Sequence, residues 1–228
     1  MRVRKSFERP EGKKTARLIV IASEGKETEK IYFNAVKNSI CAGNVHVEVL
    51  ERDSTDSSPD IVYSQLKQFQ ETYQLDDDDE LWMVIDKDRW KTPTLAGMAR
   101  LCKQSRFLHF AMSNPCFELW LLLHFEDVSM MSEDEKHALQ ENKRVSRRGD
   151  TWLKSRVRRA MGSYQEASYD ASRLMPLVSI ARNRAEVLDI NKTERWPTSI
   201  GTHVYRIIDS ITNHNGINEK TELTEGQS

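Results

Sequence analysis

A chain of 228 residues with a net charge of −1 is long enough for one large domain, and it carries no overall charge that indicates a nucleic-acid or membrane partner. Charged residues make up 30% of it, with ordinary aromatic content, which excludes a disordered chain. Its three cysteines, Cys41, Cys102 and Cys116, show no C-x-x-C spacing, so neither a disulfide framework nor a zinc site is expected. The longest apolar run, around Leu119 to Phe125, is too short to span a membrane. We therefore expect a soluble, cytoplasmic protein.

Predicted strands and helices alternate through the first half of the chain. Short apolar or alternating runs predict strands, and apolar residues at helical spacing predict the helices between them. The strands are expected at 17–22, 45–49, 81–85 and 107–112, and the helices at 28–42, 59–73 and 93–104. Strands that alternate with helices favour a parallel sheet with helices on both faces, so we predict an α/β fold.

The second half of the sequence has a different pattern. Residues 115–212 show helical periodicity and no convincing strand, which predicts a mostly helical C-terminal half. We therefore expect four regions: a basic flexible arm (1–16), an α/β core (17–126), a helical extension with a basic patch (127–212) and a disordered polar tail (213–228).

Three acidic residues come directly after two of the predicted strands. Glu24 follows the first strand, and Asp86 and Asp88 follow the third. In open parallel sheets, ligands bind outside the carboxyl ends of the strands, so these acids are candidates for one site. Three carboxylates without matching cations suit a hard cation such as Mg²⁺, and such an ion assists phosphate chemistry. A simpler interpretation stays open, in which Glu24 and Asp86 cap helices and Asp88 pairs with Lys87 or Arg89.

Glu118 and His124 lie on an otherwise apolar predicted helix. A glutamate among apolar neighbours is costly unless it is paired, hydrogen-bonded or bound to a metal. Because Glu118 follows the fourth strand, we place it at the same edge of the sheet as the other acids and consider it for catalysis. It could equally be an acid at a helix N-terminus. His124 is either a proton shuttle or substrate contact, or an interior histidine whose hydrogen bonds are satisfied.

The segment 143–159 holds eight basic residues against one acid, with a tryptophan among them. Cations that contact phosphates release counterions, and an aromatic ring can stack on an unpaired base, so this composition favours nucleic-acid binding. A solvated helix face or an acidic protein partner are the alternatives. The candidate nucleic-acid-binding residues are Lys143, Arg144, Arg147, Arg148, Trp152, Lys154, Arg156, Arg158 and Arg159.

Four motifs carry a resemblance to a known family. EGKETE at 24–29 and VIDKD at 84–88 resemble the glutamate and D-x-D motifs of TOPRIM domains, the Rossmann-like Mg²⁺ modules of topoisomerases, primases and OLD-type nucleases. SNPCFELWLLLHF at 113–125 resembles the signature of the RloB family, bacterial proteins found beside restriction and abortive-infection genes. WPTS at 196–199 is similar to that family's closing N-P-x-T segment, with Trp196 in place of the usual asparagine.

The resemblance implies a TOPRIM-type parallel sheet in which Glu24 is the general acid/base and Glu24, Asp86 and Asp88 bind the metal. The implied cofactor is Mg²⁺, or Mn²⁺ in its place. The implied activity is hydrolysis of phosphodiester bonds in RNA or DNA during anti-phage or abortive-infection defence, controlled by a co-encoded ABC/AAA-type ATPase. The alternative is a non-catalytic adaptor of a defence complex, which binds nucleic acid or a nucleotide.

Overall fold

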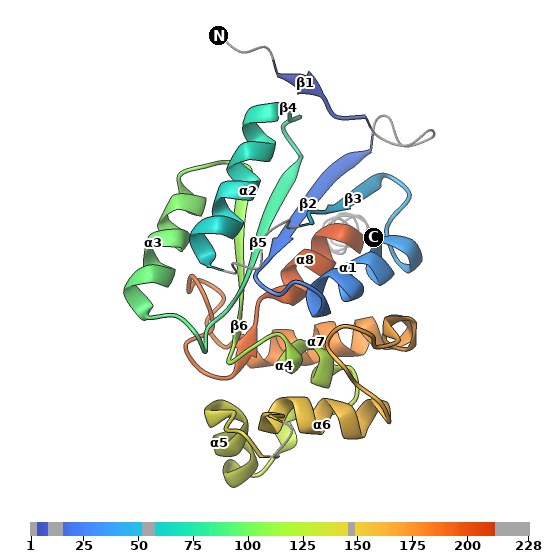
Figure 1. Cartoon of the computed structure of the whole chain (residues 1–228), viewed down its shortest axis with the longest axis vertical. Helices are drawn as coiled ribbons and strands as arrows, with labels where there is room; N and C mark the ends of the chain where they lie inside the picture. Colours follow the sequence, from blue (N-terminus) through green and yellow to red (C-terminus); the bar gives the residue numbers. More distant parts are fainter. Residues whose placement is uncertain (1–3, 9–15, 52–57, 146–148, 213–228) are drawn as a thin grey trace, which may run out of the picture.

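Four parallel strands form the centre of the molecule (Figure 1). The computed structural model of the chain describes residues 4–8, 16–51, 58–145 and 149–212. The strands lie side by side in the order β3 (Val45–Val49), β2 (Arg17–Ser23), β5 (Glu80–Asp86) and β6 (Leu108–Asn114). The predicted α/β fold is confirmed, and each of these strands lies within two residues of its expected bounds.

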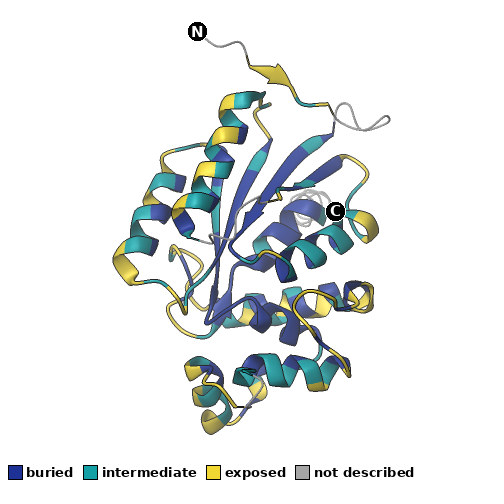
Figure 2. Ribbon diagram, in the orientation of Figure 1, coloured by how far each residue is buried: buried dark blue, intermediate teal, exposed yellow. Residues whose placement is uncertain are grey.

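Helices cover both faces of this sheet, and the strands are buried between them (Figure 2). Leu18, Val20 and Ala22 of β2 pack into the core beneath α2 and α3, while Ile19 and Ile21 pack into the core beneath α1. Because both faces of the central strands β2 and β5 are buried, apolar side chains are favoured at successive positions, and their sequences are nearly continuous apolar runs. The helix bounds are α1 (Thr28–Ser39), α2 (Pro59–Thr72) and α3 (Thr92–Lys103).

The second half of the chain is mostly helical, as predicted, with one short strand that corrects the prediction. β7 (Gly201–Thr202) pairs antiparallel with Ser113 and Asn114 of β6. A strand of two residues leaves no periodicity for a sequence pattern to detect. No helix in the described parts of the chain is long and apolar enough to cross a membrane. The helical elements are α4 (Glu118–Leu123), η1 (Val128–Met130), α5 (Glu133–Glu141), α6 (Trp152–Met161), η2 (Ala171–Leu177), α7 (Val178–Leu188) and α8 (Val204–Thr212).

Part of the expected N-terminal arm is attached to the rest of the molecule. β1 (Lys5–Ser6) pairs in parallel with β4 (Tyr73–Gln74), which directly follows α2. The ring of Phe7 lies 5.4 Å from that of Phe69 and 5.2 Å from that of Tyr73, measured between centroids. Residues 1–3 and 9–15 of the arm, and the predicted tail, 213–228, lie outside the described residues.

The turn after β6 connects segments that are distant in the sequence. The backbone amides of Asp88 and of the residue before it both donate to the carbonyl of Pro115, each at 3.1 Å. The side-chain amide of Asn114 donates to the carbonyls of Pro197 and Ser199, at 3.1 and 2.7 Å. This turn therefore fixes both the loop that follows β5 and the segment that precedes β7.

Candidate functional site

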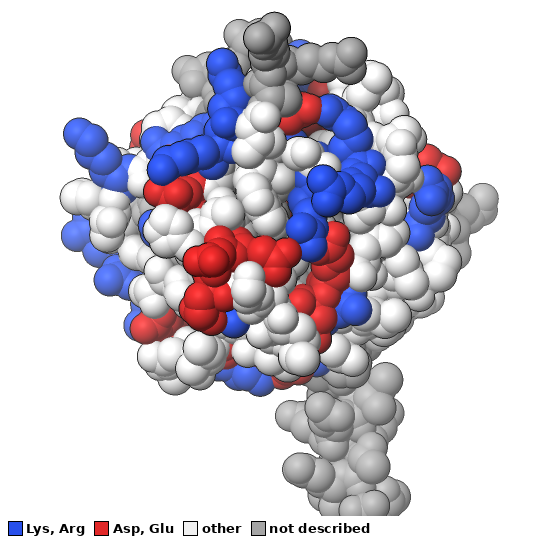
Figure 3. Space-filling model, turned by 90° about the horizontal axis from the view of Figure 1, so that it is seen from below, with Lys and Arg blue, Asp and Glu red and all other residues white. Residues whose placement is uncertain are grey.

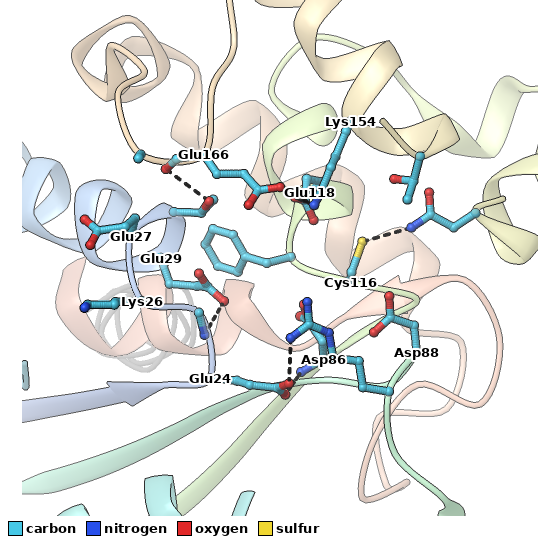
Figure 4. Close-up of a pocket in the computed structure, with 17 residues that line it drawn as sticks. Glu24, Lys26, Glu27, Glu29, Asp86, Asp88, Cys116, Glu118, Lys154 and Glu166 are labelled. Carbon is cyan, nitrogen blue, oxygen red and sulfur yellow. Dashed lines mark hydrogen bonds and ion pairs between the residues drawn. The ribbon is translucent and has the colours of Figure 1, made fainter. Parts of the chain in front are cut away.

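An acidic cavity of about 390 Å³ lies at the carboxyl ends of β2 and β5. Figure 4 shows its acidic side chains around one space. Glu24 follows β2, Glu29 lies in the first turn of α1, Asp86 ends β5 and Glu118 begins α4. Asp88 also lines the cavity. The structure thus brings together the predicted acids Glu24, Asp86, Asp88 and Glu118.

Glu24 is held in place from several sides. Its backbone amide donates to the carbonyl of Val84, at 3.0 Å, which ties it to β5. Its carboxylate accepts hydrogen bonds from the Trp90 indole at 2.9 Å and from the Asp86 backbone amide at 3.3 Å. The Arg89 guanidinium lies 3.7 Å from the other carboxylate oxygen. Burial nevertheless raises the pKa of Glu24 above its usual value, because removal from water outweighs these contacts.

Glu29 is a cavity acid that the sequence analysis missed. Its carboxylate accepts a hydrogen bond from the Gly25 backbone amide at 3.0 Å. Only glycine permits this approach, because a Cβ at position 25 would lie 1.7 Å from Glu29 Oε2. Burial, together with the nearby carboxylates of Glu118 and Glu24, raises the pKa of Glu29 to about 7. The available signal was the third acid of the EGKETE motif, which looks like part of an ordinary helix start.

Asp86 and Asp88 lie at different depths. Asp86, the last residue of β5, is half-buried, whereas Asp88 is exposed in the loop that follows. Because the strand ends at Asp86, the alternation of extended backbone does not fix the direction of Asp88. Burial and the carboxylates of Glu29 and Glu118 raise the pKa of Asp86 well above its usual value. Asp86 is therefore the more strongly perturbed acid of the D-x-D motif.

Glu118, Lys154 and Glu166 line the other side of the cavity. Lys154 of α6 pairs with Glu166, and its Nζ atom lies 3.9 Å from Glu118 Oε1. The Tyr164 hydroxyl donates to the same Glu118 oxygen at 3.3 Å. Burial acts to lower the pKa of Lys154, but its hydrogen bond to Glu166 and the charge of Glu118 outweigh it, so that pKa is raised. The buried Glu118 thus has both a cation and a hydrogen-bond donor beside it.

Acids outnumber bases in the cavity wall. Its acidic residues are Glu24, Glu27, Glu29, Asp86, Asp88, Glu118 and Glu166, and its basic residues are Lys26, Arg89 and Lys154. Carboxylate oxygens are the ligands that Mg²⁺ prefers, usually one or two of them together with water, so the donor set fits this ion. As the side chains stand, no three His, Cys, Asp or Glu residues in the described part of the chain are grouped closely enough to hold a metal ion.

His124 lies in the interior and is not among the residues that line the acidic cavity. Its Nδ1 atom is 2.9 Å from the carbonyl oxygen of Trp120, and its Nε2 atom is 3.2 Å from the Tyr32 hydroxyl. Burial lowers the pKa of His124 to about 4, so the imidazole is neutral near pH 7. Both ring nitrogens have partners, which favours the interior interpretation over the proposed proton shuttle.

A family model described as RloB-like protein matches residues 19–211. The chain is a member of the RloB-like family. The match confirms the predicted family and spans the cavity acids from Glu24 to Glu166 as well as the closing WPTS segment. No curated protein and no solved structure matches the chain.

Acidic residues compensate several cations of the basic segment in this RloB-like chain. Besides Lys154, which pairs with Glu166 at the cavity as described above, three of the predicted nucleic-acid-binding residues form ion pairs. A cation that is already paired contributes less to phosphate binding, because the pair must be disrupted first. The three pairs are Lys143–Glu141 (2.7 Å), Arg156–Glu126 (2.8 Å) and Arg158–Asp150.

The other predicted nucleic-acid-binding residues differ in exposure. Arg144 and Arg159 are exposed, whereas Trp152 is half-buried with the Arg156 guanidinium 5.4 Å from its ring centroid. Arg147 and Arg148, the two remaining predicted residues, lie outside the described part of the chain. The surface seen from the end of the molecule that carries α5 and α6 shows acidic and basic side chains gathered next to each other (Figure 3). The basic run in the sequence thus forms part of a surface of mixed charge.

Proposed function

We propose that the chain is a metal-dependent endonuclease that hydrolyses phosphodiester bonds in RNA or DNA. The observation that carries this proposal is the gathering of Glu24, Glu29, Asp86 and Glu118 in one cavity at the carboxyl ends of parallel strands. Ligands of α/β sheets bind at this edge. The raised pKa values of Glu24, Glu29 and Asp86 reflect negative charge in a buried space, which a bound cation offsets.

Glu24 and Asp86 are the residues that would hold Mg²⁺, or Mn²⁺ in its place, with Glu29 and Asp88 as further donors. They lie at the ends of neighbouring strands, and the Glu24 carboxylate already contacts the Asp86 backbone amide at 3.3 Å. Carboxylates and water are the usual protein-bound surroundings of this ion. When bound, the ion would polarise a phosphoryl oxygen and lower the pKa of an attacking water.

Glu24 is suited to move a proton during hydrolysis. When Asp86 rather than Glu24 contacts the ion, the raised pKa of Glu24 brings it closer to neutral pH, where a general acid or base is most effective. The Trp90 indole and the Asp86 amide fix the orientation of its carboxylate. On the far side of the cavity, Lys154 supplies positive charge toward the negative charge that develops on a phosphate.

The family and the motif order support a TOPRIM-type defence nuclease. The neighbouring strands β2 and β5 lead into the EGKETE and VIDKD motifs, which is the arrangement that the TOPRIM resemblance implies. Membership of the RloB-like family supports a role in anti-phage or abortive-infection defence. In this proposal the nuclease acts in the cytoplasm, and a co-encoded ABC/AAA-type ATPase restrains or triggers it.

Ion-dependent cleavage of labelled RNA and DNA tests the proposal. Cleavage is measured with Mg²⁺, with Mn²⁺ and with a chelator, in the presence and absence of the co-encoded ATPase. We expect Glu24→Gln and Asp86→Asn to reduce the rate by about 100-fold or more, the usual contribution of a positioned acid or base. Asp60→Asn, an exposed acid of α2 outside the cavity, is the matched control. Unaltered cleavage by both cavity variants would refute the site.

The second candidate is the non-catalytic adaptor. The placement of the acids favours this candidate. Among the described residues, no three side chains that could ligate a metal are close enough together to form an ion site. Calorimetric titration with Mg²⁺ and Mn²⁺ separates the two candidates when combined with the cleavage assay. Binding of nucleic acid without cleavage under any ion or ATPase condition would support the adaptor.

A further inference from the structure

We infer that the acidic cavity accepts a single nucleic-acid strand and excludes an intact duplex. This inference rests on the proposed function, because it names the class of substrate that can reach the proposed site. It is carried by the depth of the acids, by the hydrogen bonds that close one wall of the cavity and by its size.

Three of the acids that line the cavity are buried. Glu24 and Glu29 are each 3% exposed and Glu118 is 7% exposed, whereas Asp88 is exposed at the surface. A phosphate that reaches Glu24 must therefore enter the cavity and cannot remain at the molecular surface. The phosphates of a duplex lie on the outside of a wide, stiff double helix. They can reach Glu24 only if the cavity admits part of that double helix.

Hydrogen bonds attach the segment after α6 to the start of α1 and thereby close one wall. The Tyr169 hydroxyl donates to the carbonyl of Thr28 at 2.7 Å, and the Thr28 hydroxyl donates to the carbonyl of Glu166 at 3.3 Å. Tyr164 and Lys154 reach Glu118 from the same direction. Both ends of this wall are thus bound to elements of the α/β core, and widening the cavity would break several buried contacts.

The dimensions of the cavity agree with one strand. A volume of about 390 Å³ admits a single nucleotide, whereas the two paired and stacked strands of a duplex need several times that space. An unpaired nucleotide, or one that has been drawn out of a helix, presents a smaller cross-section and a flexible backbone. Lys26 lines the cavity as a cation for its phosphates, and Arg89 and Lys154, which also contact Glu24 and Glu166, add positive charge to the wall.

Cleavage of one oligonucleotide in three forms tests the inference. The labelled strand is supplied alone, annealed along its full length, and annealed to a partner that leaves a central loop unpaired, in RNA and DNA versions. We expect the single strand to be cut at least about tenfold faster than the full duplex, because a duplex must first unpair and unstack a nucleotide. In the third form, cuts should fall within the unpaired loop. Equal rates on the duplex and the single strand would overturn the inference.

A wall variant connects this preference to named contacts. Tyr169→Phe removes the hydrogen bond to Thr28, and we expect it to raise the rate on the duplex relative to the single strand. Tyr63→Phe, a half-buried tyrosine of α2 outside the cavity, is the control and should leave the ratio unchanged. An unchanged ratio in Tyr169→Phe would overturn the assignment of this wall as the barrier.

Failure of the proposed function is distinguishable from failure of the inference. If no form is cleaved with any ion, the nuclease proposal fails, and the inference is then decided by binding. Fluorescence anisotropy of the same three oligonucleotides measures their affinity without requiring cleavage. A preference for the single strand of at least about tenfold would sustain the inference, and tighter binding of the duplex would overturn it.

Discussion

Gly25→Ala tests whether the cavity depends on the position of the Glu29 carboxylate. A Cβ at residue 25 would lie 1.7 Å from Glu29 Oε2, and real contacts do not fall below 3.0 Å, so this oxygen must retreat by at least 1.3 Å. The retreat breaks the hydrogen bond from the Gly25 amide, and bonds to charged groups contribute about 1.5–3 kcal/mol. Gly25 does not have a positive φ, so its backbone accommodates alanine. The expected cost in unfolding free energy is therefore about 1–3 kcal/mol, with the fold retained.

Calorimetric titration with Mg²⁺ and Mn²⁺, alongside urea denaturation without the ion, measures both effects of Gly25→Ala. We expect ion affinity to fall about tenfold, as in Glu29→Gln, and the double variant to fall no further because both changes act on one side chain. Gly97→Ala in α3 is the matched control, since a Cβ there meets nothing within 4 Å. Wild-type ion affinity in Gly25→Ala, or additive losses in the double variant, would refute the reasoning.

Without a divalent ion, the effect of Glu29→Gln on stability should depend on pH. The pKa of Glu29 is about 7 in the folded chain against a usual 4.5, so its contribution to the unfolding free energy declines as the pH rises from about 4.5 through 7. In urea titrations, the unfolding free energy of Glu29→Gln relative to wild type should be about 1–3 kcal/mol higher at about pH 8 than at about pH 5. The same difference between variant and wild type at both pH values would contradict this prediction. If nucleic acid binds the exposed face of α6, Arg159→Ala should reduce the salt slope of binding by about 1. Arg156→Ala loses an ion pair with α5 and one with the segment after α4, so it should cost about 1 kcal/mol of stability and leave the salt slope unchanged. Filter binding measures the slope and thermal melting the stability, and the reverse result would contradict the assignment of Arg159 to binding and Arg156 to stability. Asn114→Ala, which removes two donated hydrogen bonds and one accepted from Gln140, should cost about 2–4 kcal/mol in urea denaturation, and a cost near zero would mean that these contacts are dispensable.

The strand-end acids could be predicted because the change from apolar to polar residues marks the end of a buried strand. Glu24 and Asp86 lie at such ends, and the parallel order of β2 and β5 brings them together. The depth of Asp88 could not be predicted in the same way, because Asp88 lies in the loop beyond β5, where no regular backbone period determines the direction of a side chain. Glu29 was missed since a helical pattern gives no sign that its carboxylate turns back to the Gly25 amide.

The basic segment shows a different limit of the sequence. Its cations lie close together in the sequence, but three of the acids that pair with them, Glu126, Glu135 and Glu166, lie outside the segment and meet them only after folding. The composition of the segment therefore revealed its positive charge but not the acids outside it that pair with its cations. The two-residue strand β7 escaped detection for a related reason, because its pairing is determined by β6 rather than by its own sequence.

The contacts of Asn114 have a consequence for the order in which the site is assembled during synthesis. Domains fold as the chain is made, from the N-terminus onwards. When both acid-bearing strands and α4 have been synthesised, the carbonyls of Pro197 and Ser199 that receive the Asn114 amide do not yet exist. The turn that holds the loop of Asp88 is therefore secured only after the segment that contains Pro197 and Ser199 has been synthesised. A nascent chain that stops before this segment carries the acids but not the contacts that secure this turn, so a protein proposed to cut nucleic acid would stay inert until the segment is added.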